Sequence, residues 1–187
     1  MRIFAIHAEI PIMKRGLRFG VLVTALCLTA SFSVPSMATV KVATPSWAST
    51  KGAQGQLLKV SQARKIPAKG ATITIIGRGY DETVGIYIAL CVKPKPQHKP
   101  TPCGGGVDKS GATGSSVWVS SNPPPYGVGL AIPFGVDGKF RITLKVGPHI
   151  GKQDCRRVSC AIVTRADHTN SEFRGADVLI PVTFTNK

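Results

Sequence analysis

Apolar and polar residues alternate along much of this chain, and this pattern predicts short β-strands. The clearest stretch is 139–146, in which every second residue is apolar; these residues are Phe140, Ile142, Leu144 and Val146. The residues between them are Lys139, Arg141, Thr143 and Lys145. Because successive side chains of a strand point to opposite faces, we expect one buried face and one solvent-exposed face here.

A second kind of strand is predicted at 84–92, where neither face carries a charge. One face is aliphatic: Val84, Ile86, Ile88, Leu90 and Val92. The other face is mostly small: Gly85, Tyr87, Ala89 and Cys91. Both faces are therefore expected to be covered, as in a central strand. The small face leaves two interpretations open, an ordinary core strand that ends in a disulfide, or the floor of a shallow binding cleft.

Further strands are predicted at 57–61, 71–76, 115–120, 161–164 and 177–185. Pro181 places the last of these at a sheet edge or a bulge, because proline has no N–H to donate. The turn signals between strands are Pro67–Gly70, Gly77–Gly79, which breaks the strand before it, and Asp137–Gly138. About seven short strands without helical periodicity predict an all-β fold, an antiparallel immunoglobulin-like β-sandwich.

Two proline-rich segments interrupt this pattern, at 93–102 and at 122–126. Proline cannot donate to a sheet ladder, so both are expected to form extended loops of polyproline-II type. They lie in a Pro/Gly-rich insertion, 93–135, within one domain that spans 57–187. The Asp167–Ser171 stretch is expected to form a loop as well.

The N-terminal region has the features of a secretory signal peptide. Basic residues at 13–18 precede an apolar run at 19–32 and a small-x-small site at 36–38. We expect residues 1–38 to be removed, with Met13 as an alternative start, and residues 39–56 to form a flexible leader. The mature protein is then secreted and loosely associated with the envelope.

Cysteine and histidine usage argues against catalysis. Removal of the signal peptide takes Cys27 and leaves Cys91, Cys103, Cys155 and Cys160. An even number in a secreted chain implies two disulfides, with three connectivities available. Cysteines in bridges supply neither a thiolate nucleophile nor a zinc site. Asp167–His168 is the one acid–histidine neighbour pair, while His98 and His149 are expected to be solvated. We expect no catalytic residues, metal or cofactor.

The charge of the chain is strongly positive. The sequence has 24 Lys and Arg against 9 Asp and Glu; the signal peptide contains four of the former and one of the latter, so the mature chain keeps a net charge of +12. Such a charge attracts polyanions, and for a secreted protein these are acidic envelope polymers or an anionic membrane surface. A basic surface without a specific partner is the alternative. Nucleic acid is a weaker hypothesis, because no base-reading element is recognisable. The candidate basic surface is Lys93, Lys95, Lys99, Arg156 and Arg157.

Several motifs occur in an order that matches a known family. Gly77-x-Gly79 precedes the central strand, Cys91 ends that strand, and Cys103 follows about a dozen residues later. Asp154-Cys155-x₄-Cys160 then leads into a strand, and the stretch 180–184 closes the domain. Over 57–184 the chain resembles the neocarzinostatin family, secreted apoproteins that carry enediyne chromophores. The resemblance implies a seven-stranded sandwich, the disulfides Cys91–Cys103 and Cys155–Cys160, an apolar cleft beside the first disulfide, and an association with DNA-directed antibiotic cargo.

The sequence departs from that family at the cleft. Lys93 stands where the family has a Trp, and the segment 147–153 lacks the aromatic residues of the family's hairpin. Val163 and Arg165 replace a Gly and a Ser that leave room for the ligand. Aromatic residues of the insertion either rebuild a wall of the cleft or fill the core beneath a long loop. The ligand-cleft candidates are Tyr87, Cys91, Cys103, Trp118, Tyr126 and Phe134.

These departures, together with a basic charge where the family is acidic, determine the expected function. We expect a monomeric, non-catalytic binding module that associates with the envelope or with other polyanions through its basic surface. The alternative is an antibiotic-type apoprotein that carries a small apolar ligand, with an association with DNA.

Overall fold

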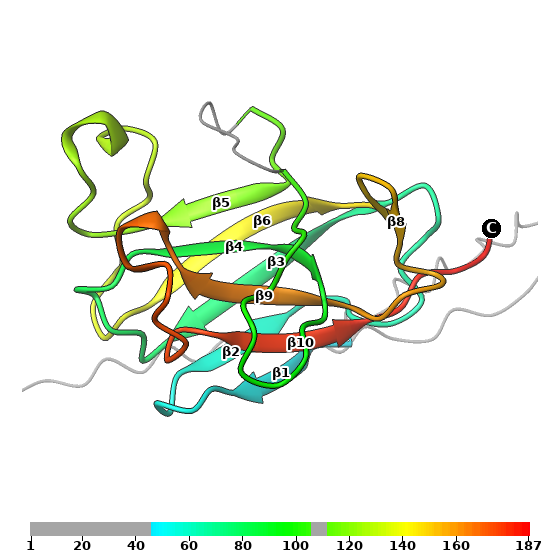
Figure 1. Cartoon of the computed structure of the whole chain (residues 1–187), viewed down its shortest axis with the longest axis horizontal. Coiled ribbons are helices and arrows are strands. Elements are labelled where there is room, and N and C mark those ends of the chain that lie inside the picture. The colour runs from blue at the N-terminus through cyan, green and yellow to red at the C-terminus, as the bar shows by residue number, and fades with distance from the viewer. Residues whose placement is uncertain (1–45, 106–111) are drawn as a thin grey trace, which may run out of the picture. The chain divides into compact units, whose positions relative to one another are not determined.

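The computed structural model describes residues 46–105 and 112–187, which form two antiparallel sheets packed face to face (Figure 1). The predicted signal peptide, the alternative start at Met13 and residues 39–45 of the predicted leader lie outside the described residues. Each sheet has four strands, so the predicted β-sandwich is confirmed. No helix among the described residues is long and apolar enough to cross a membrane.

The strands of the first sheet follow the order β1-β2-β3-β6. They are β1 Ala48–Lys51, β2 Leu57–Val60, β3 Ala71–Arg78 and β6 Phe140–Val146. The second sheet has the order β10-β9-β4-β5. Its strands are β10 Val178–Val182, β9 Cys160–Ala166, β4 Ile86–Val92 and β5 Ser116–Val119. The remaining elements are a hairpin of β7 His149–Ile150 and β8 Gln153–Asp154, and the 3-10 helices η1 Pro125–Gly127 and η2 His168–Asn170.

The hydrophobic core fills the space between the two sheets, and the alternation in the sequence accounts for it. In β6 every second residue from Phe140 to Val146 is buried and the residues between them are exposed, as predicted. The largest side chains with almost no exposure come from both sheets: Leu58, Ile73, Ile75, Ile86, Ile88, Leu144 and Ile162. Burial of each of these side chains stabilises the folded state by about 1.5–3 kcal/mol, so the core between the sheets is the principal source of stability.

The strand predicted at the centre, β4, does lie between two neighbours, β9 and β5. Its aliphatic face enters the main core, and its small face lies on the outside of the second sheet. There Ala89 and Cys91 join Ala161 and Val163 in a second, smaller apolar cluster. Both implied disulfides are present, Cys91–Cys103 and Cys155–Cys160. Pro181 was predicted at a sheet edge or a bulge, and it lies in β10, which is an edge strand.

Three local expectations differ from the structure. The segment expected to be a flexible leader contains β1, which pairs with β2 and brings the sandwich to eight strands instead of about seven. β3 continues through Gly77 instead of breaking there, because Gly77 pairs with Phe140 of β6. A Cβ at Gly77 would lie 2.1 Å from the Phe140 ring, so packing against this ring requires the glycine.

The third difference concerns the loops. Part of the predicted polyproline segment 122–126 turns into the 3-10 helix η1, in which the Gly127 N–H donates to the Pro124 carbonyl. The loop predicted after β9 contains η2, because the side chain of Asp167 accepts a hydrogen bond from the Thr169 N–H and caps its first turn. The Asp137–Gly138 turn is present, with positive φ at both residues.

Candidate functional site

The predicted cleft corresponds to the outer face of the second sheet, which has an aromatic half and a small apolar half. Strand register explains the division. Tyr87 of β4 pairs with Trp118 of β5 on one side and with Arg165 of β9 on the other. Two residues further along β4, Ala89 lies between Ser116 and Val163. The aromatic half therefore contains Tyr87, Trp118 and Arg165, whose side chains can form hydrogen bonds.

Trp118 is held in the aromatic half by a buried carboxylate. Its indole N–H donates to Oδ2 of Asp167 at 2.8 Å, and Asp167 is only 2% exposed. The other carboxylate oxygen accepts from the backbone N–H and the hydroxyl of Thr169, at 2.8 and 2.6 Å. Gly85 makes this position available, because a Cβ there would lie 2.0 Å from Oδ2 of Asp167. Asp167 thus joins the end of β9, η2 and β5.

His168 connects two tyrosines from distant parts of the chain. Its Nδ1 is hydrogen-bonded to the Tyr87 hydroxyl and its Nε2 to the Tyr126 hydroxyl. The imidazole and the Trp118 ring also form a T-shaped pair, with their centroids 5.3 Å apart. Burial, and then the charge of Asp167, raise the pKa of Tyr87 to about 12. Since both ring nitrogens are engaged, His168 acts as a bridge that fixes η1 against the sheet.

The apolar half of the face is covered by the chain itself. The segment 93–102 leaves β4, passes over β9 and β10, and returns to the sheet at Cys103 (Figure 1). Pro100 is buried, and its carbonyl accepts a hydrogen bond of 3.4 Å from Nη1 of Arg165. The Arg165 guanidinium also lies over the Tyr87 ring, 5.9 Å from its centroid, and burial lowers its pKa. Arg165 therefore occupies part of the space that a ligand of this face would need.

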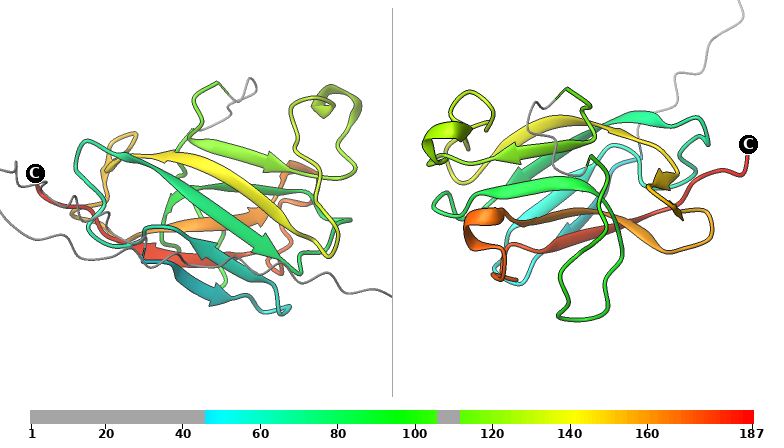
Figure 2. Two further views of the ribbon diagram at one scale, coloured as in Figure 1. Left: turned by 180° about the vertical axis from the view of Figure 1, so that it is seen from behind. Right: turned by 45° about the horizontal axis from the view of Figure 1, so that its top comes forward.

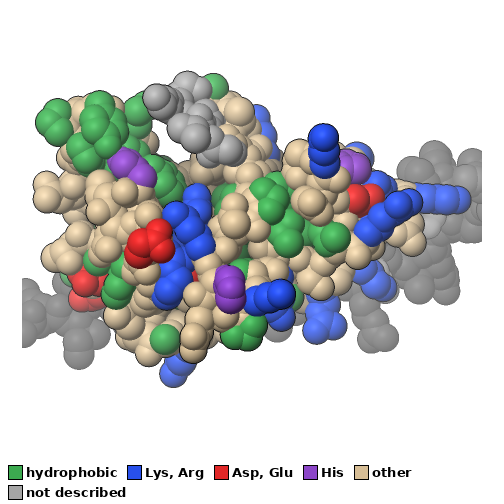
Figure 3. All heavy atoms as spheres, in the orientation of Figure 1, with side chains coloured by type: hydrophobic (Ala, Val, Ile, Leu, Met, Phe, Trp, Pro, Cys, Tyr) green, Lys and Arg blue, Asp and Glu red, His purple; other side chains and the backbone are tan. Residues whose placement is uncertain are grey.

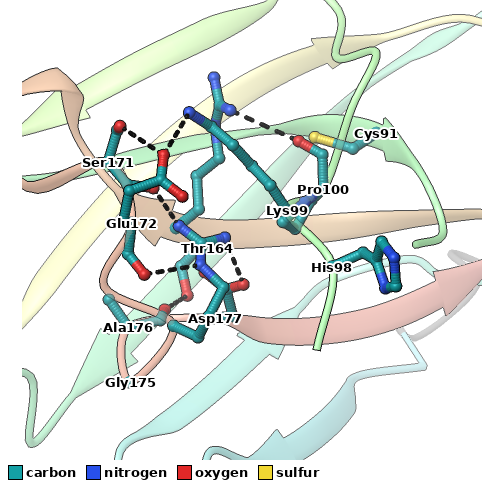
Figure 4. A network of polar contacts seen from close by, with 12 residues as sticks. Cys91, His98, Lys99, Pro100, Thr164, Ser171, Glu172, Gly175, Ala176 and Asp177 are labelled. Atoms are coloured by element: carbon teal, nitrogen blue, oxygen red, sulfur yellow. Dashed lines mark hydrogen bonds and ion pairs between the residues drawn. The ribbon is translucent and has the colours of Figure 1, made fainter. Parts of the chain in front are cut away.

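Two ion pairs lie beside the apolar half, where the loop between β9 and β10 meets the segment 93–102 (Figure 4). Lys99 lies 3.8 Å from Glu172, and Nη1 of Arg174 donates to Oδ2 of Asp177 at 2.8 Å. Oδ1 of Asp177 is buried and has no hydrogen-bond partner among the described residues. Burial raises the pKa of Asp177 to about 6, and Arg174 opposes that shift only in part.

The six predicted cleft residues do not all lie on this face. Tyr87, Cys91, Cys103 and Trp118 lie on it, and Tyr126 reaches it through His168. Phe134 does not, because it is 8% exposed in the main core, with its ring centroid 6.4 Å from Tyr80 and 6.2 Å from Phe140. Of the insertion's aromatic residues, Phe134 therefore fills the core, whereas Trp118 and Tyr126 lie on the outer face.

Two residues of this face, Asp167 and His168, had no predicted role on it. Asp167 and His168 stood out only as a neighbouring acid–histidine pair, and their hydrogen bonds go to other groups instead of to each other. Arg165 was predicted at the cleft only as a bulky side chain, and its contacts with Pro100 and the Tyr87 ring were not predicted. Among the described residues, no cluster of three or more His, Cys, Asp or Glu side chains could hold a metal ion.

The predicted basic surface is partly neutralised by nearby acids. Lys93, Lys95 and Arg157 are exposed. Lys99 approaches Glu172, as described above, and Arg156 forms a two-pronged pair with Asp154, at 2.9 Å from its Nε and 2.9 Å from its Nη2. This pair holds the pKa of Asp154 well below its usual range.

A stronger concentration of positive charge lies on the outer face of the first sheet. Every charged residue of its four strands is basic, and all are exposed: Lys51, Lys59, Arg78, Arg141 and Lys145. We call these five residues the cationic face. None of them forms an ion pair with another described residue. A depression of about 550 Å³ at one end of this face is lined by Arg78, Lys139 and Arg141 together with Ile132 and Pro133.

Comparison with known proteins gives a similarity of structure. No protein-family model matches the chain, and no curated protein matches it in sequence. Among solved structures, macromomycin is similar, with 17% sequence identity, a TM-score of 0.44, and coverage of 74% of this chain and 99% of macromomycin. Macromomycin is an enediyne apoprotein of the neocarzinostatin family, the family that the sequence motifs resemble. At this identity the likeness concerns the fold alone.

Proposed function

We propose that this protein is an extracellular, non-catalytic binding module that associates with anionic polymers or surfaces of the cell envelope. The observation that carries the proposal is the cationic face, which has five exposed cations on four strands and no acidic residue on any of them. Like charges at this density repel one another, and a bound polyanion relieves that repulsion while it releases its own counterions.

The strand register supports a continuous surface. Ser49, Lys59, Ile76 and Arg141 form one row across the sheet, so Lys59 and Arg141 flank Ile76. At a strand spacing of about 4.8 Å, their Cα atoms lie roughly 10 Å apart, which is close to the screening length of about 8 Å at physiological ionic strength. The first sheet faces the viewer in the left view of Figure 2, where its strands lie side by side.

The location and the absence of catalysis rest on separate observations. Both disulfides are of a kind that forms and persists in oxidising compartments outside the cytosol. The acid and the histidine that could serve a hydrolytic mechanism are each committed elsewhere, Asp167 to Trp118 and Thr169, His168 to two tyrosines. The exposed loop cations Lys93, Lys95 and Arg157 add to the attraction of a polyanion, but the cationic face determines where it binds.

Retention on immobilised polyglutamate or polyphosphate as a function of salt concentration tests this function. We expect strong retention in low salt that is lost as salt rises, because exposed charges are screened. Lys59→Glu with Arg141→Glu should abolish retention. Lys93→Ala with Lys95→Ala and Lys99→Ala should weaken it less. If the loop variant loses retention and the sheet variant keeps it, the binding surface is the predicted loop set; if the wild-type protein is never retained, the proposed function is wrong.

A second candidate function, transport of a small apolar ligand, has one observation in its favour. The outer face of the second sheet carries the small side chains Ala89, Ala161 and Val163 beside the Cys91–Cys103 disulfide. Arg165 and Pro100 cover part of it. Titration with an uncharged polycyclic aromatic probe distinguishes this candidate, because a ligand on this face would lie near Trp118 and change its fluorescence.

A further inference from the structure

The segment that joins β5 to β6 exposes an unusual run of large apolar side chains. Over residues 126–136, which we call the apolar loop, the exposed fractions are 65% for Tyr126, 73% for Val128, 44% for Leu130, 44% for Ile132 and 78% for Val136. Single exposed apolar residues are ordinary, whereas a contiguous group marks a site of interaction with a protein or a membrane. In Figure 3, apolar side chains gather over the region of η1, at the upper left.

The backbone of this loop holds the apolar side chains in place. Ile132 pairs with β5, since its N–H donates to the Trp118 carbonyl and its carbonyl accepts from Ser120 N–H, both at 2.9 Å. Within the loop the Leu130 N–H donates to the Gly127 carbonyl at 3.0 Å. The hydroxyl of Tyr126 is tied to His168. The apolar side chains are thus presented from a fixed loop instead of being free to fold back into the core.

The apolar loop adjoins the cationic face. Ile132 and Pro133 line the same depression as Arg78, Lys139 and Arg141. Val136 belongs to the turn between Gly135 and Lys139, which pair with each other just before β6 begins. An apolar projection beside a group of cations is complementary to one kind of partner. An anionic bilayer places negative headgroups at its surface and apolar chains beneath them, whereas a soluble acidic polymer offers nothing to the apolar side chains.

We propose that the partner of the cationic face is an anionic lipid bilayer, into whose surface the apolar loop inserts Val128 and Leu130. This inference rests on the proposed function, and it names the partner. Binding then has two parts, an electrostatic attraction that salt weakens and an apolar insertion that salt does not weaken. An acidic polymer would show only the first part.

Co-sedimentation with vesicles tests the proposal. The vesicles contain phosphatidylcholine with about one third phosphatidylglycerol, and pure phosphatidylcholine vesicles are the uncharged reference. We expect much stronger binding to the anionic vesicles than to the uncharged ones, with a remainder that persists at a salt concentration that elutes the protein from polyglutamate. Val128→Asn with Leu130→Asn keeps the net charge and should lower vesicle affinity at least about tenfold while leaving retention on polyglutamate unchanged.

Matched variants keep the outcome interpretable. Trp47→Asn removes an exposed apolar side chain, 42% exposed, outside the apolar loop and should leave vesicle binding unchanged. Circular dichroism and a thermal melt verify that each variant is folded. Lys59→Glu with Arg141→Glu should abolish retention on polyglutamate and leave at most the part of vesicle binding that salt does not remove.

Three results would overturn the inference in different ways. Retention on polyglutamate without vesicle binding, or equal vesicle binding by wild type and the asparagine variant, refutes insertion and leaves the proposed function standing. Concentration-dependent dimerisation that the asparagine variant loses, without vesicle binding, assigns the apolar loop to a second copy of the chain. The absence of binding to either partner rejects the proposed function as well.

Discussion

Trp118 and Asp167 are 49 residues apart in the sequence and meet through one hydrogen bond on the outside of the second sheet. The carboxylate is almost fully buried, and the indole N–H satisfies the oxygen that Thr169 does not reach. A buried acceptor without its donor costs the full desolvation penalty of the group. The pair therefore connects the stability of the sandwich to the aromatic half of its outer face.

Trp118→Phe should lower the free energy of unfolding by about 1–3 kcal/mol, because it leaves Oδ2 of Asp167 unsatisfied. Urea denaturation measures the change. Tyr126→Phe is the control, since Tyr126 is 65% exposed and its hydroxyl bonds an exposed histidine; its effect should stay within about 0.5 kcal/mol. Equal losses in the two variants would show that the Trp118–Asp167 bond contributes nothing of its own.

Ile142→Ala should lower the free energy of unfolding by about 2–5 kcal/mol, since it removes a buried side chain from the core between the sheets. Lys145→Ala, three residues further on and on the exposed face of the same strand, should change it by no more than about 0.5 kcal/mol. Denaturant melts of both variants check the register of β6, and a larger effect at Lys145 would contradict it.

Gly85→Ala should destabilise the fold, because the added Cβ would lie 2.0 Å from the Asp167 carboxylate. The carboxylate would have to move and would lose its bonds to Trp118 or Thr169, which gives an expected loss of about 1–3 kcal/mol. Gly147→Ala is the matched control, since a Cβ at that position would meet no other atom within 4 Å. Thermal melts that rank Gly147→Ala as the more damaging change would refute the close approach at Gly85.

Asp177 should make stability fall as pH rises between about 4 and 6. Its pKa is about 6 in the folded protein against 3.8 for the free group, because burial outweighs the attraction of Arg174, Arg165 and Lys99. In that window the native state binds a proton that the unfolded state has released, so the unfolding free energy decreases with pH. Its contribution is complete below about pH 4 and is lost once the pH passes about 6.

Urea melts across that pH window measure this slope, and Asp177→Asn should flatten it by up to one proton. An unchanged slope in Asp177→Asn would show that another group is responsible.

Sequence periodicity predicted the strands well because period-two alternation and burial have the same physical origin. It identified the stretch that became β6 and the central position of β4, and the motif order supplied both disulfide pairings. It missed β1, because Ala48–Lys51 is short and has no apolar alternation; pairing with β2 is what holds it in the sheet. It took Gly77 for a strand break, although the glycine is there to admit the Phe140 ring.

The candidate surfaces were harder to predict, since they depend on register between distant strands. Tyr87, Tyr126 and His168 come from three separate segments, and nothing in their local sequence indicates that one imidazole joins the two hydroxyls. The cations of the cationic face are likewise spread over four strands, one or two to a strand, whereas the loop lysines Lys93, Lys95 and Lys99 are close together in the sequence. Only strand pairing brings Lys59 and Arg141 onto one surface. Phe134 illustrates the reverse case, in which a residue of a loop-rich insertion packs into the core.

The two edges of the second sheet bear on how the molecule behaves when many copies are crowded together. On β10 the edge carries Pro181, which has no N–H, and on β5 the backbone is already paired with Ile132. Neither edge therefore offers an unbroken ladder to the strand of a neighbour, the route by which sheet proteins usually aggregate. A protein concentrated on a charged surface gains from such edges, because it can cover that surface densely and still remain a layer of separate molecules.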